Sequence, residues 1–298
     1  MDFRLKVFFT VASRLSFTKA ASELFITQPA ISKHIQELEE EYKIKLFERN
    51  GSKIALTNAG EMLFKHTKNI FEIYREIDFD MSTFINERKG LLRLGASSTI
   101  SQYIIPPLLA RFHQKLESVK VNLLNGNTEQ IENALLNKEI EIGIVEGQSK
   151  NQSIKYTQFI KDELVLVCNV NNSLVQKKEI IPLDLKSLRF VMREQGSGTL
   201  EVIEYALKPF NINIEQLQVE MQLGSTESIK SYLMNSDCVA FMSIHAIIKE
   251  LNNSELQIID IDNLTIERYF YIITLHGKSD SLSELFIKNI WSHYNLKL

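Results

Sequence analysis

The chain of 298 residues is predicted to fold as an α+β multidomain protein. Three observations predict this class. Apolar residues recur at helical spacing in the first 45 residues, residues 59–89 carry one uninterrupted helical pattern, and strand and helix patterns alternate from residue 90 onward. These patterns place the domain boundaries at 1–58, 59–89 and 90–298.

Composition and charge exclude several classes of protein. With 44% hydrophobic and 24% charged residues the chain has an ordinary globular composition, and no run approaches the ~18 apolar residues of a membrane helix. No hydrophobic signal sequence follows the first residues. Cys168 and Cys238 lie far apart, which suggests neither a disulfide framework nor a zinc site. We expect a cytoplasmic protein with no membrane contact, metal or cofactor.

Charge is distributed unevenly along the chain. The formal net charge is −3, yet residues 1–58 hold nine Lys and Arg against seven Asp and Glu, a net of +2. The remainder is negative. The small positive excess is weak support for an amino-terminal nucleic-acid contact.

The first 45 residues predict three short helices. Apolar spacings of three and four mark the first helix, at Phe3, Val7, Phe8, Val11 and Leu15. Ser16 can cap a second helix, and Thr27 can cap a third that has Pro29 in its first turn, where a missing N–H has no cost. The second and third helices are joined by residues 25–26. This is the helix-turn-helix pattern, in which the later helix enters the major groove of DNA.

Polar groups on the third helix suit DNA recognition. Gln28 can pair with adenine, Ser32 can contact bases or phosphate, and Lys33 attracts phosphate. Residues 46–57 predict a hairpin with Asn50-Gly51 as its turn and basic side chains beside it, a wing next to the reading helix. The candidate DNA-binding residues are Thr27, Gln28, Pro29, Ala30, Ser32, Lys33, Gln36, Arg49 and Lys53. The alternative is a small helical bundle whose polar face is merely solvated.

Residues 59–89 predict one long helix with an apolar seam. Apolar side chains repeat every seven residues or fill intermediate positions, at Leu63, Ile70, Ile73, Tyr74, Ile77, Met81 and Phe84. Charged residues elsewhere on the helix leave little other apolar surface. We therefore expect pairing with the same helix of a second chain, a homodimer that presents two reading helices to a two-fold symmetric DNA site.

From Gly90 onward the patterns predict parallel βαβ units in a doubly wound sheet, divided into two lobes. The expected strands are 91–96, 119–124, 140–145, 164–168, 190–192, 218–223, 239–242 and 269–273. The expected helices are 101–116, 129–136, 200–210, 228–235 and 282–294.

Hydroxyl and amide side chains follow four of these strands. Ligands gather at the carboxyl ends of strands and at helix N-termini, where free N–H groups attract anions. The candidate ligand-binding residues are Ser97, Ser98, Thr99, Asn127, Thr128, Arg193, Gly196, Ser197, Thr199, Ser225 and Thr226. Any one loop is explained better by helix capping than by a ligand site, but four such loops after four strands favour a site.

Enzyme motifs are missing from the sequence. There is no Gly-x-Ser-x-Gly, no Gly-x-Gly-x-x-Gly and no Gly-Lys-Ser/Thr phosphate loop, and the six histidines are scattered. Glu139, Glu141 and Glu146 flank one strand, and we interpret them as ordinary surface charge. We expect no catalytic residues.

The amino-terminal motifs closely resemble the winged helix-turn-helix of LysR-type transcriptional regulators. The motifs are Ala20-Ala21-Ser22-Glu23-Leu24, Thr27-Gln28-Pro29-Ala30-Ile31-Ser32-Lys33-His34-Ile35, Leu46-Phe47-Glu48-Arg49 and Leu56-Thr57-Asn58-Ala59-Gly60-Glu61. The resemblance continues through the chain at lower specificity. It implies a linker helix that dimerises, homotetramers, contact with RNA polymerase, and an effector domain similar to type 2 periplasmic binding proteins with a small-molecule inducer between its lobes.

Carried onto this sequence, the resemblance implies hinges near Asp162–Leu166 and Arg268–Ile272, lobe I at 90–163 plus 268–298, and lobe II at 164–267. Residues 95–100, 126–128 and 193–199 look most like the branch that regulates sulphur assimilation and carbon fixation. That branch often has Arg where Leu200 stands here, and a glycine-rich turn in place of Ser236-Asp237-Cys238.

These observations predict a regulator that binds double-stranded DNA and is gated by a small metabolite, anionic rather than cationic. The alternative is a two-lobed metabolite-binding protein whose helical head contacts proteins instead of DNA.

Overall fold

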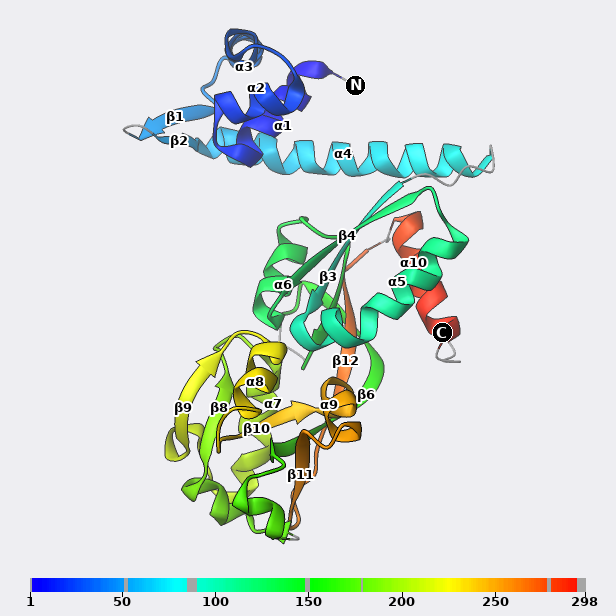
Figure 1. Cartoon of the computed structure of the whole chain (residues 1–298). Coiled ribbons are helices and arrows are strands. Elements are labelled where there is room, and N and C mark those ends of the chain that lie inside the picture. Colours follow the sequence, from blue (N-terminus) through cyan, green and yellow to red (C-terminus); the bar gives the residue numbers. More distant parts are fainter. Residues whose placement is uncertain are drawn as a thin grey trace. The chain divides into compact units, whose positions relative to one another are not determined.

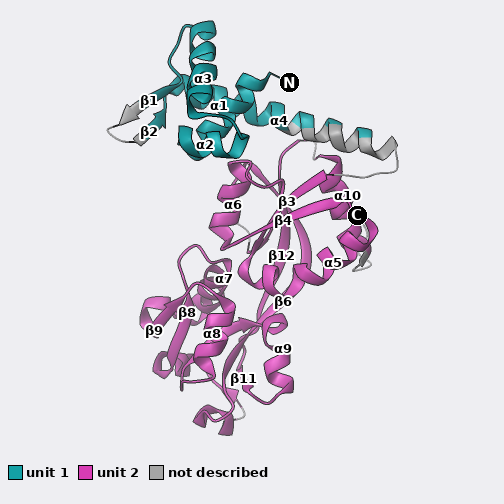
Figure 2. Ribbon diagram, turned by 45° about the horizontal axis from the view of Figure 1, so that its top comes forward, with its two compact units in different colours: residues 1–81 teal, residues 82–298 magenta. Residues whose placement is uncertain are grey.

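The computed structural model describes residues 2–50, 53–84, 90–147, 151–177, 179–277 and 280–293. The chain divides into two compact units, Met1–Met81 and Ser82–Leu298 (Figure 2). In the part that is described, no helix is both long and apolar enough to cross a membrane.

The first unit opens with the three predicted helices, α1 (Phe3–Arg14), α2 (Phe17–Leu24) and α3 (Gln28–Tyr42). The predicted caps are confirmed, because Ser16 accepts a hydrogen bond from the Lys19 amide and Thr27 accepts one from the Ala30 amide. The buried apolar faces of the helices share one core, formed by Val7, Phe8, Val11, Ala12, Ala20, Ala21, Ile31, Ile35, Leu38 and Leu46.

The predicted hairpin follows as β1 (Phe47–Asn50) and β2 (Lys53–Leu56). Its strands are antiparallel, and Asn50 pairs with Lys53. Gly51 of the predicted Asn50-Gly51 turn lies outside the described residues, and Asn50 is the last residue of β1. The side chains of Arg49 and Lys53 also lie outside the described part.

Helix α4 (Asn58–Phe84) is the predicted long helix. It was expected to continue to residue 89, but residues 85–89 are outside the described range, as is the side chain of Phe84. Leu63 packs against the core of the first unit. Apolar side chains farther along the seam are exposed, at Ile70, Ile73, Tyr74, Ile77 and Met81.

Lobe I of the second unit contains three parallel strands, with β3 (Gly90–Ser97) between β4 (Val119–Gly126) and β5 (Ile142–Glu146). The helices of this lobe are the π-helix Ile100–Ile104, α5 (Ile105–Lys115), α6 (Thr128–Leu136) and the closing helix α10 (Ser281–His293) (Figure 1). The expected single helix over 101–116 is thus a π-helical turn followed by an α-helix that has prolines in its first turn.

Lobe II repeats the arrangement around β8, β9 and β10. Its elements are β7 (Glu179–Ile180), β8 (Arg189–Arg193), α7 (Gly198–Leu207), β9 (Gln218–Leu223), α8 (Thr226–Leu233), β10 (Val239–Ser243), α9 (Ile244–Asn252) and β11 (Leu256–Ile261). Neither α9 nor β11 was predicted.

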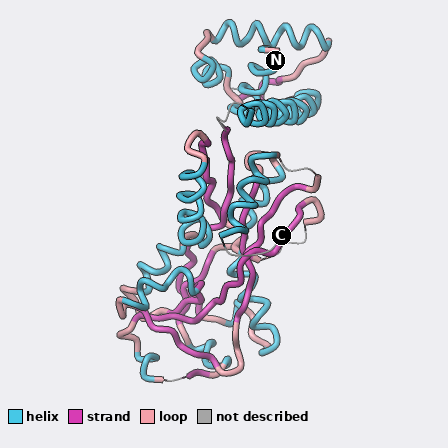
Figure 3. Tube along the Cα trace, turned by 90° about the vertical axis from the view of Figure 1, so that its right-hand side faces the viewer, coloured by secondary structure: helices cyan, strands magenta, loops and turns pink. Residues whose placement is uncertain are grey.

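Two long strands, β6 (Ile154–Asn169) and β12 (Ile266–Leu275), join the lobes. Each lobe also contains strands of its own (Figure 3). The two long strands pair antiparallel, with Leu164 opposite Ile266 and Ile154 opposite Leu275. The main path of the sheet has the order β4-β3-β5-β12-β6-β10-β8-β9, and β11 pairs with both β6 and β7. The expected parallel βαβ units are present in both lobes, and the two hinge strands add antiparallel pairing, since β12 runs antiparallel to both β5 and β6.

Candidate DNA-reading helix and interlobe site

Helix α3 presents the predicted polar face. Ile31 and Ile35 are buried, whereas Gln28, Lys33 and Gln36 are exposed. The remaining candidates are exposed Thr27 and Pro29 and half-buried Ala30 and Ser32. This face is open to a partner because the burial of its apolar residues turns it away from the core.

Hydrogen bonds within the face hold its side chains in a defined arrangement. The Gln28 amide donates to the Ser32 hydroxyl over 3.0 Å, and the Gln36 amide donates to Glu40 over 2.8 Å. The Thr27 hydroxyl is occupied in capping α3. Gln28 and Ser32 are thus paired one helical turn apart, in the first half of the helix.

A residue that sequence reasoning missed attaches the hairpin to α3. Glu39 is buried, and its carboxylate accepts hydrogen bonds from the amides of Leu46 and Phe47 at 2.9 and 3.4 Å and from Lys45 Nζ at 2.5 Å. The start of the hairpin is therefore fixed to the reading helix. Glu39 is one of four glutamates in the segment 37–41, and nothing in their spacing indicates this role.

In the second unit, the structure brings candidate ligand residues from the two lobes together; we call this the interlobe site. Lobe I contributes Ser97, Ser98, Thr99, Asn127 and Thr128, and lobe II contributes Arg193, Gly196, Ser197 and Thr199; all are buried except half-buried Gly196.

Direct hydrogen bonds join the two lobes at this site. Arg193 Nη2 donates to the Ser98 hydroxyl over 3.3 Å, and the Asn127 amide donates to the Gln195 carbonyl over 3.3 Å. The backbone N–H of Glu129, in the first turn of α6, donates to the Gly196 carbonyl. The Cβ of any residue other than glycine at position 196 would lie 2.5 Å from Glu129 Oε2, and the φ of +80° there also requires glycine.

Ser225 and Thr226 lie apart from this hydrogen-bonded group. Thr226 is buried at the start of α8 and Ser225 caps it in extended conformation. No hydrogen bond of the described residues connects either hydroxyl to the other candidates.

The largest omission of the sequence reasoning is a buried charged cluster under the interlobe site. Arg268 Nη1 lies 2.9 Å from Glu146 Oε2, and Arg268 Nε lies 2.7 Å from Asp162 Oδ2. The Thr199 hydroxyl donates to Glu146 Oε2 over 2.5 Å and accepts from Arg268 Nη1 over 2.8 Å. This cluster connects both hinge strands, lobe I through Glu146 and lobe II through Thr199.

The interpretation of Glu146 as surface charge is wrong. Glu146 is 1% exposed, at the end of a strand in which all five residues are buried. Burial alone raises the pKa of a carboxyl group, but the guanidiniums of Arg268 and Arg193 and the hydroxyls of Thr199 and Thr99 outweigh burial and lower the pKa of Glu146 to about 2. Glu146 is therefore ionised at neutral pH.

Four buried polar atoms near this cluster have no hydrogen-bond partner among the described residues: Ser97 Oγ, Ser197 Oγ, Glu146 Oε1 and Arg268 Nη2. Buried polar groups are nearly always hydrogen-bonded, so four unpaired atoms from both lobes indicate a place for a polar molecule. Hydroxyls and a guanidinium can donate to an anion. Among the described residues no group of three or more His, Cys, Asp or Glu is arranged to hold a metal ion.

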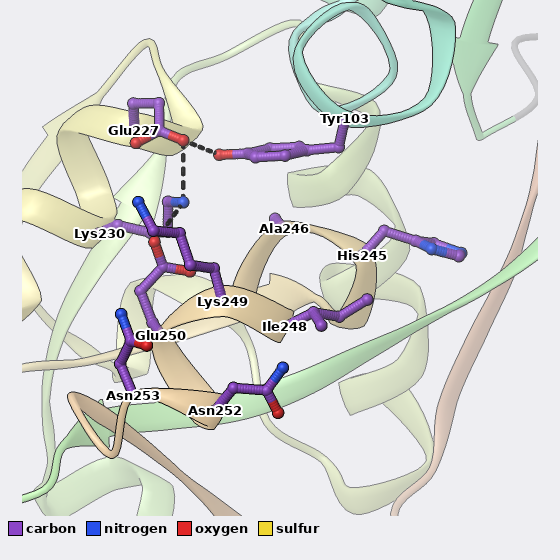
Figure 4. Close-up of a pocket in the computed structure, with 10 residues that line it drawn as sticks. All are labelled: Tyr103, Glu227, Lys230, His245, Ala246, Ile248, Lys249, Glu250, Asn252 and Asn253. Atoms are coloured by element: carbon purple, nitrogen blue, oxygen red, sulfur yellow. Dashed lines mark hydrogen bonds and ion pairs between the residues drawn. The ribbon is translucent and has the colours of Figure 1, made fainter. Parts of the chain in front are cut away.

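A second contact between the lobes lies beside a pocket of about 530 Å³ (Figure 4). Tyr103, on the π-helix of lobe I, donates to Glu227 of α8, and Lys230 Nζ lies 2.8 Å from both Glu227 and Glu250. The ammonium group of Lys230 also lies 4.9 Å from the centre of the Tyr103 ring. His245 points away from this group toward Asp162, at 3.9 Å. Tyr103 and Lys230 were not among the predicted residues.

Two of the residues at which the sequence departs from the resembling branch, Leu200 and Cys238, are buried, whereas Asp237 is exposed. Leu200 is 3% exposed within α7, and the Cys238 thiol lies 3.3 Å from Glu220 Oε2. Burial, followed by the Glu220 contact, raises the pKa of Cys238. The positive charge at the interlobe site thus comes from Arg193 and Arg268 and not from position 200.

Two family matches cover most of the chain. Residues 3–61 match the bacterial regulatory helix-turn-helix family of LysR type, and residues 86–294 match the LysR substrate binding domain. The chain is 29% identical over 295 residues to CysL of Bacillus subtilis, covering 99% of this chain and 98% of that protein. It is 32% identical over 298 residues to a probable RuBisCO transcriptional regulator of Cyanophora paradoxa, covering 99% and 92%.

Solved structures agree in fold. The regulatory domain of Synechocystis CcmR, determined in complex with 2-PG, is 30% identical with a TM-score of 0.63, and the match covers 68% of this chain and 96% of that one. Full-length CbnR in complex with its target DNA has a TM-score of 0.68 at 20% identity, covering 98% and 99%. The reading helix, the two-lobed domain and these matches lead to one conclusion: the chain belongs to the LysR family of DNA-binding transcriptional regulators.

Proposed function

We propose that this regulator is gated by a small anionic metabolite bound at the interlobe site. The observation that carries the proposal is the meeting of buried hydroxyls, the N-termini of α6 and α7, and Arg193 from two lobes that are joined by only two long strands. Helix N-termini and a guanidinium favour an anion. CcmR was solved with 2-PG, and 2-phosphoglycolate is itself an anion, which supports the same class here.

The residue roles follow from this placement. Ser97, Ser98, Thr99, Asn127 and Thr128 would line the site from lobe I, and Arg193, Gly196, Ser197 and Thr199 from lobe II, with the Ser97 and Ser197 hydroxyls and the Arg193 guanidinium as donors to the ligand. Ser225 and Thr226, which lie apart from the hydrogen-bonded group at the start of α8, would complete the lining of the interlobe site. On DNA, the first turns of α3 would contact base edges and phosphates, with the hairpin as a wing.

We divide the chain into a DNA-binding domain at 1–58, a linker helix at 59–89 and an effector domain at 90–298. In the proposed assembly the linker helix, α4, forms the dimer interface. Exposed Ile73, Ile77 and Met81 lie on one face of α4 and would be covered by the partner helix. Two dimers would form a tetramer on a two-fold symmetric promoter site in the cytoplasm and contact RNA polymerase. Ligand-dependent movement of the lobes would alter the packing of dimers, so the protein would act by binding and not by catalysis.

Thermal unfolding of the full chain tests the ligand class. The probes are sulfate, thiosulfate, O-acetylserine, glycolate and 2-phosphoglycolate. We expect one anion to raise the unfolding temperature in a dose-dependent manner, and Ser98→Ala and Thr199→Ala to abolish the rise. Ser231→Ala, on an exposed part of α8, is the matched control and should retain it. A response to none of the anions would contradict the proposal.

A further inference from the structure

Arg193 has an unusual partner, its own neighbour in the sequence. Arg193 Nε lies 2.8 Å from Glu194 Oε2, and Arg193 Nη2 lies 3.0 Å from Glu194 Oε1. The guanidinium, which is 5% exposed, therefore holds the carboxylate with two parallel hydrogen bonds. This is the geometry in which arginine binds a carboxylate or phosphate ligand.

A group from the other lobe completes the contact. The Asn127 side-chain amide, at the start of α6 in lobe I, donates to Glu194 Oε1 over 3.3 Å, while Arg193 Nη2 also reaches Ser98 of lobe I. Arg193 and Asn127 are both candidate ligand-binding residues, and Glu194 occupies their donors. The Glu194 carboxylate therefore bridges the lobes where an anionic ligand is expected.

Glu194 is charged in this position and is able to leave it. Burial raises the pKa of Glu194, but hydrogen bonding to Arg193, the charge of Arg193 and the Asn127 amide lower the pKa below its ordinary value. The Glu194 side chain is 29% exposed, in contrast to 5% for Arg193. Next to it, Gly224 has no side chain, and its Cβ position is 3.8 Å from Glu194 Oε2. The carboxylate can thus move toward water.

The balance of charge at the site changes with this movement. Arg193 and Arg268 face the carboxylates of Glu146, Asp162 and Glu194. With Glu194 in place these three carboxylates outnumber the two guanidiniums, and the Glu129 carboxylate beside Gly196 adds to the excess, so an entering anion is repelled. When Glu194 turns outward the excess falls by one, and Arg193 is left without its counter-ion.

We propose that Glu194 is an internal substitute for the anionic group of the effector, which a carboxylate or other oxyanion displaces from Arg193 and Asn127. This inference rests on the proposed function and adds a way in which anion binding is controlled. Without ligand, Glu194 holds the lobes together, and its competition for Arg193 and Asn127 sets the apparent affinity for the anion. The apparent affinity for the ligand equals the intrinsic affinity multiplied by the fraction of molecules in which Glu194 has left the site vacant.

Calorimetric titration of the full chain with the same anions measures the competition. Glu194→Gln and Glu194→Ala remove the competing charge, and Glu204→Gln removes an equal charge from an exposed position of α7. We expect both Glu194 variants to bind the responding anion about tenfold more tightly than the wild type, which corresponds to a vacant site in about a tenth of the wild-type molecules. Glu204→Gln should match the wild type.

The outcomes separate this inference from the proposed function. Wild-type binding with no gain in either Glu194 variant would overturn the inference and leave the anion site standing. No binding by any of the proteins would overturn both. Binding by the variants alone would support both.

A second readout excludes a merely structural role for Glu194. Without anion, both variants should unfold at a lower temperature because Arg193 is buried and unpaired, and the responding anion should restore the wild-type value. A lowered temperature that the anion does not restore would contradict the inference. Arg193→Met in the Glu194→Gln background should remove the gain in affinity.

Discussion

Arg268, on hinge strand β12, contacts the other hinge strand, lobe I and lobe II through Asp162, Glu146 and Thr199. It neutralises Glu146 and Asp162, which are both almost completely buried. Removing one partner of a buried ion pair leaves an uncompensated charge, so Arg268→Met should lower the free energy of unfolding by about 3–5 kcal/mol. Urea denaturation of the full chain measures the change.

The matched control for Arg268 lies on the same two strands. Lys161 pairs with Glu267 at 2.7 Å, and each side chain is 53% exposed. Exposed pairs contribute little, so Lys161→Met should leave the denaturation midpoint nearly unchanged. Equal effects of the two substitutions would contradict the role given to the buried cluster.

Glu146 gives the cluster a dependence on pH. Its pKa in the folded protein, about 2, lies below its ordinary value of 4.5. The stability it contributes is therefore fully present above pH 4.5 and is lost as the pH falls from 4.5 toward 2. Glu146→Gln should be less stable at pH 7 and lose less stability over this acid range. Unfolding temperatures measured from pH 7 to 3 check this; parallel curves for the two proteins would refute it.

The hydroxyl residues of the interlobe site could be predicted from sequence, and the charged cluster could not. Ser98 and Thr199 follow strands, a position that a local pattern reveals. Glu146 and Arg268 are 122 positions apart and become partners only because β5 and β12 pair in the folded sheet. A carboxylate at the end of a fully apolar strand was the one available signal for Glu146.

At the scale of single elements, we expect helix α3 to determine which DNA sequence is bound. Gln28 and Ser32 are hydrogen-bonded to each other on its open face. If Gln28 reads a base edge, Gln28→Ala should reduce discrimination between the preferred and mutated sites by about 1–3 kcal/mol. Competition binding with DNA sites that differ at single base pairs measures this loss.

Lys33→Ala is the contrasting substitution on the same helix. The Lys33 side chain is 76% exposed and suited to phosphate, so its loss should weaken binding to all sequences and reduce the salt slope by about one. A loss of base preference in Lys33→Ala, with none in Gln28→Ala, would reverse these assignments.

We expect the exposed apolar face of helix α4 to form the dimer interface. Ile73 and Ile77 are 56% and 47% exposed on one face of the helix. Ile73→Glu should convert dimers to monomers, because it places a charge in the proposed seam, and should weaken DNA binding at least tenfold through loss of the second head. Light scattering and mobility shifts measure both effects. Lys65→Gln changes charge by the same amount on an exposed position of α4 and should leave the dimer intact.

Elements with strong periodicity were predicted well from sequence, and elements defined by the sheet were not. Helices α1 to α4 follow apolar spacing and capping residues. The first half of β6 mixes buried, half-buried and exposed residues, including exposed Lys155 and Lys161, and has no apolar run to mark it. Its strand conformation comes from pairing with β12 along its length.

At the scale of the whole molecule, we expect a ligand bound in one unit to change DNA binding by the other. The hinge strands, the charged cluster and the Tyr103–Glu227 contact all depend on the relative position of the lobes. A ligand can shift that position only by as much as it binds the two arrangements differently. The coupling should therefore be reciprocal: DNA should change the affinity for the anion by the same factor as the anion changes the affinity for DNA.

Footprinting of the full chain on a selected DNA site, with and without the anion that binds, tests the central claim most directly. We predict a two-fold symmetric footprint whose extent changes when the anion is added, and a Thr199→Ala protein that gives the same footprint but no change. A footprint that a bound anion leaves unaltered, or no DNA binding at low salt, would contradict the account.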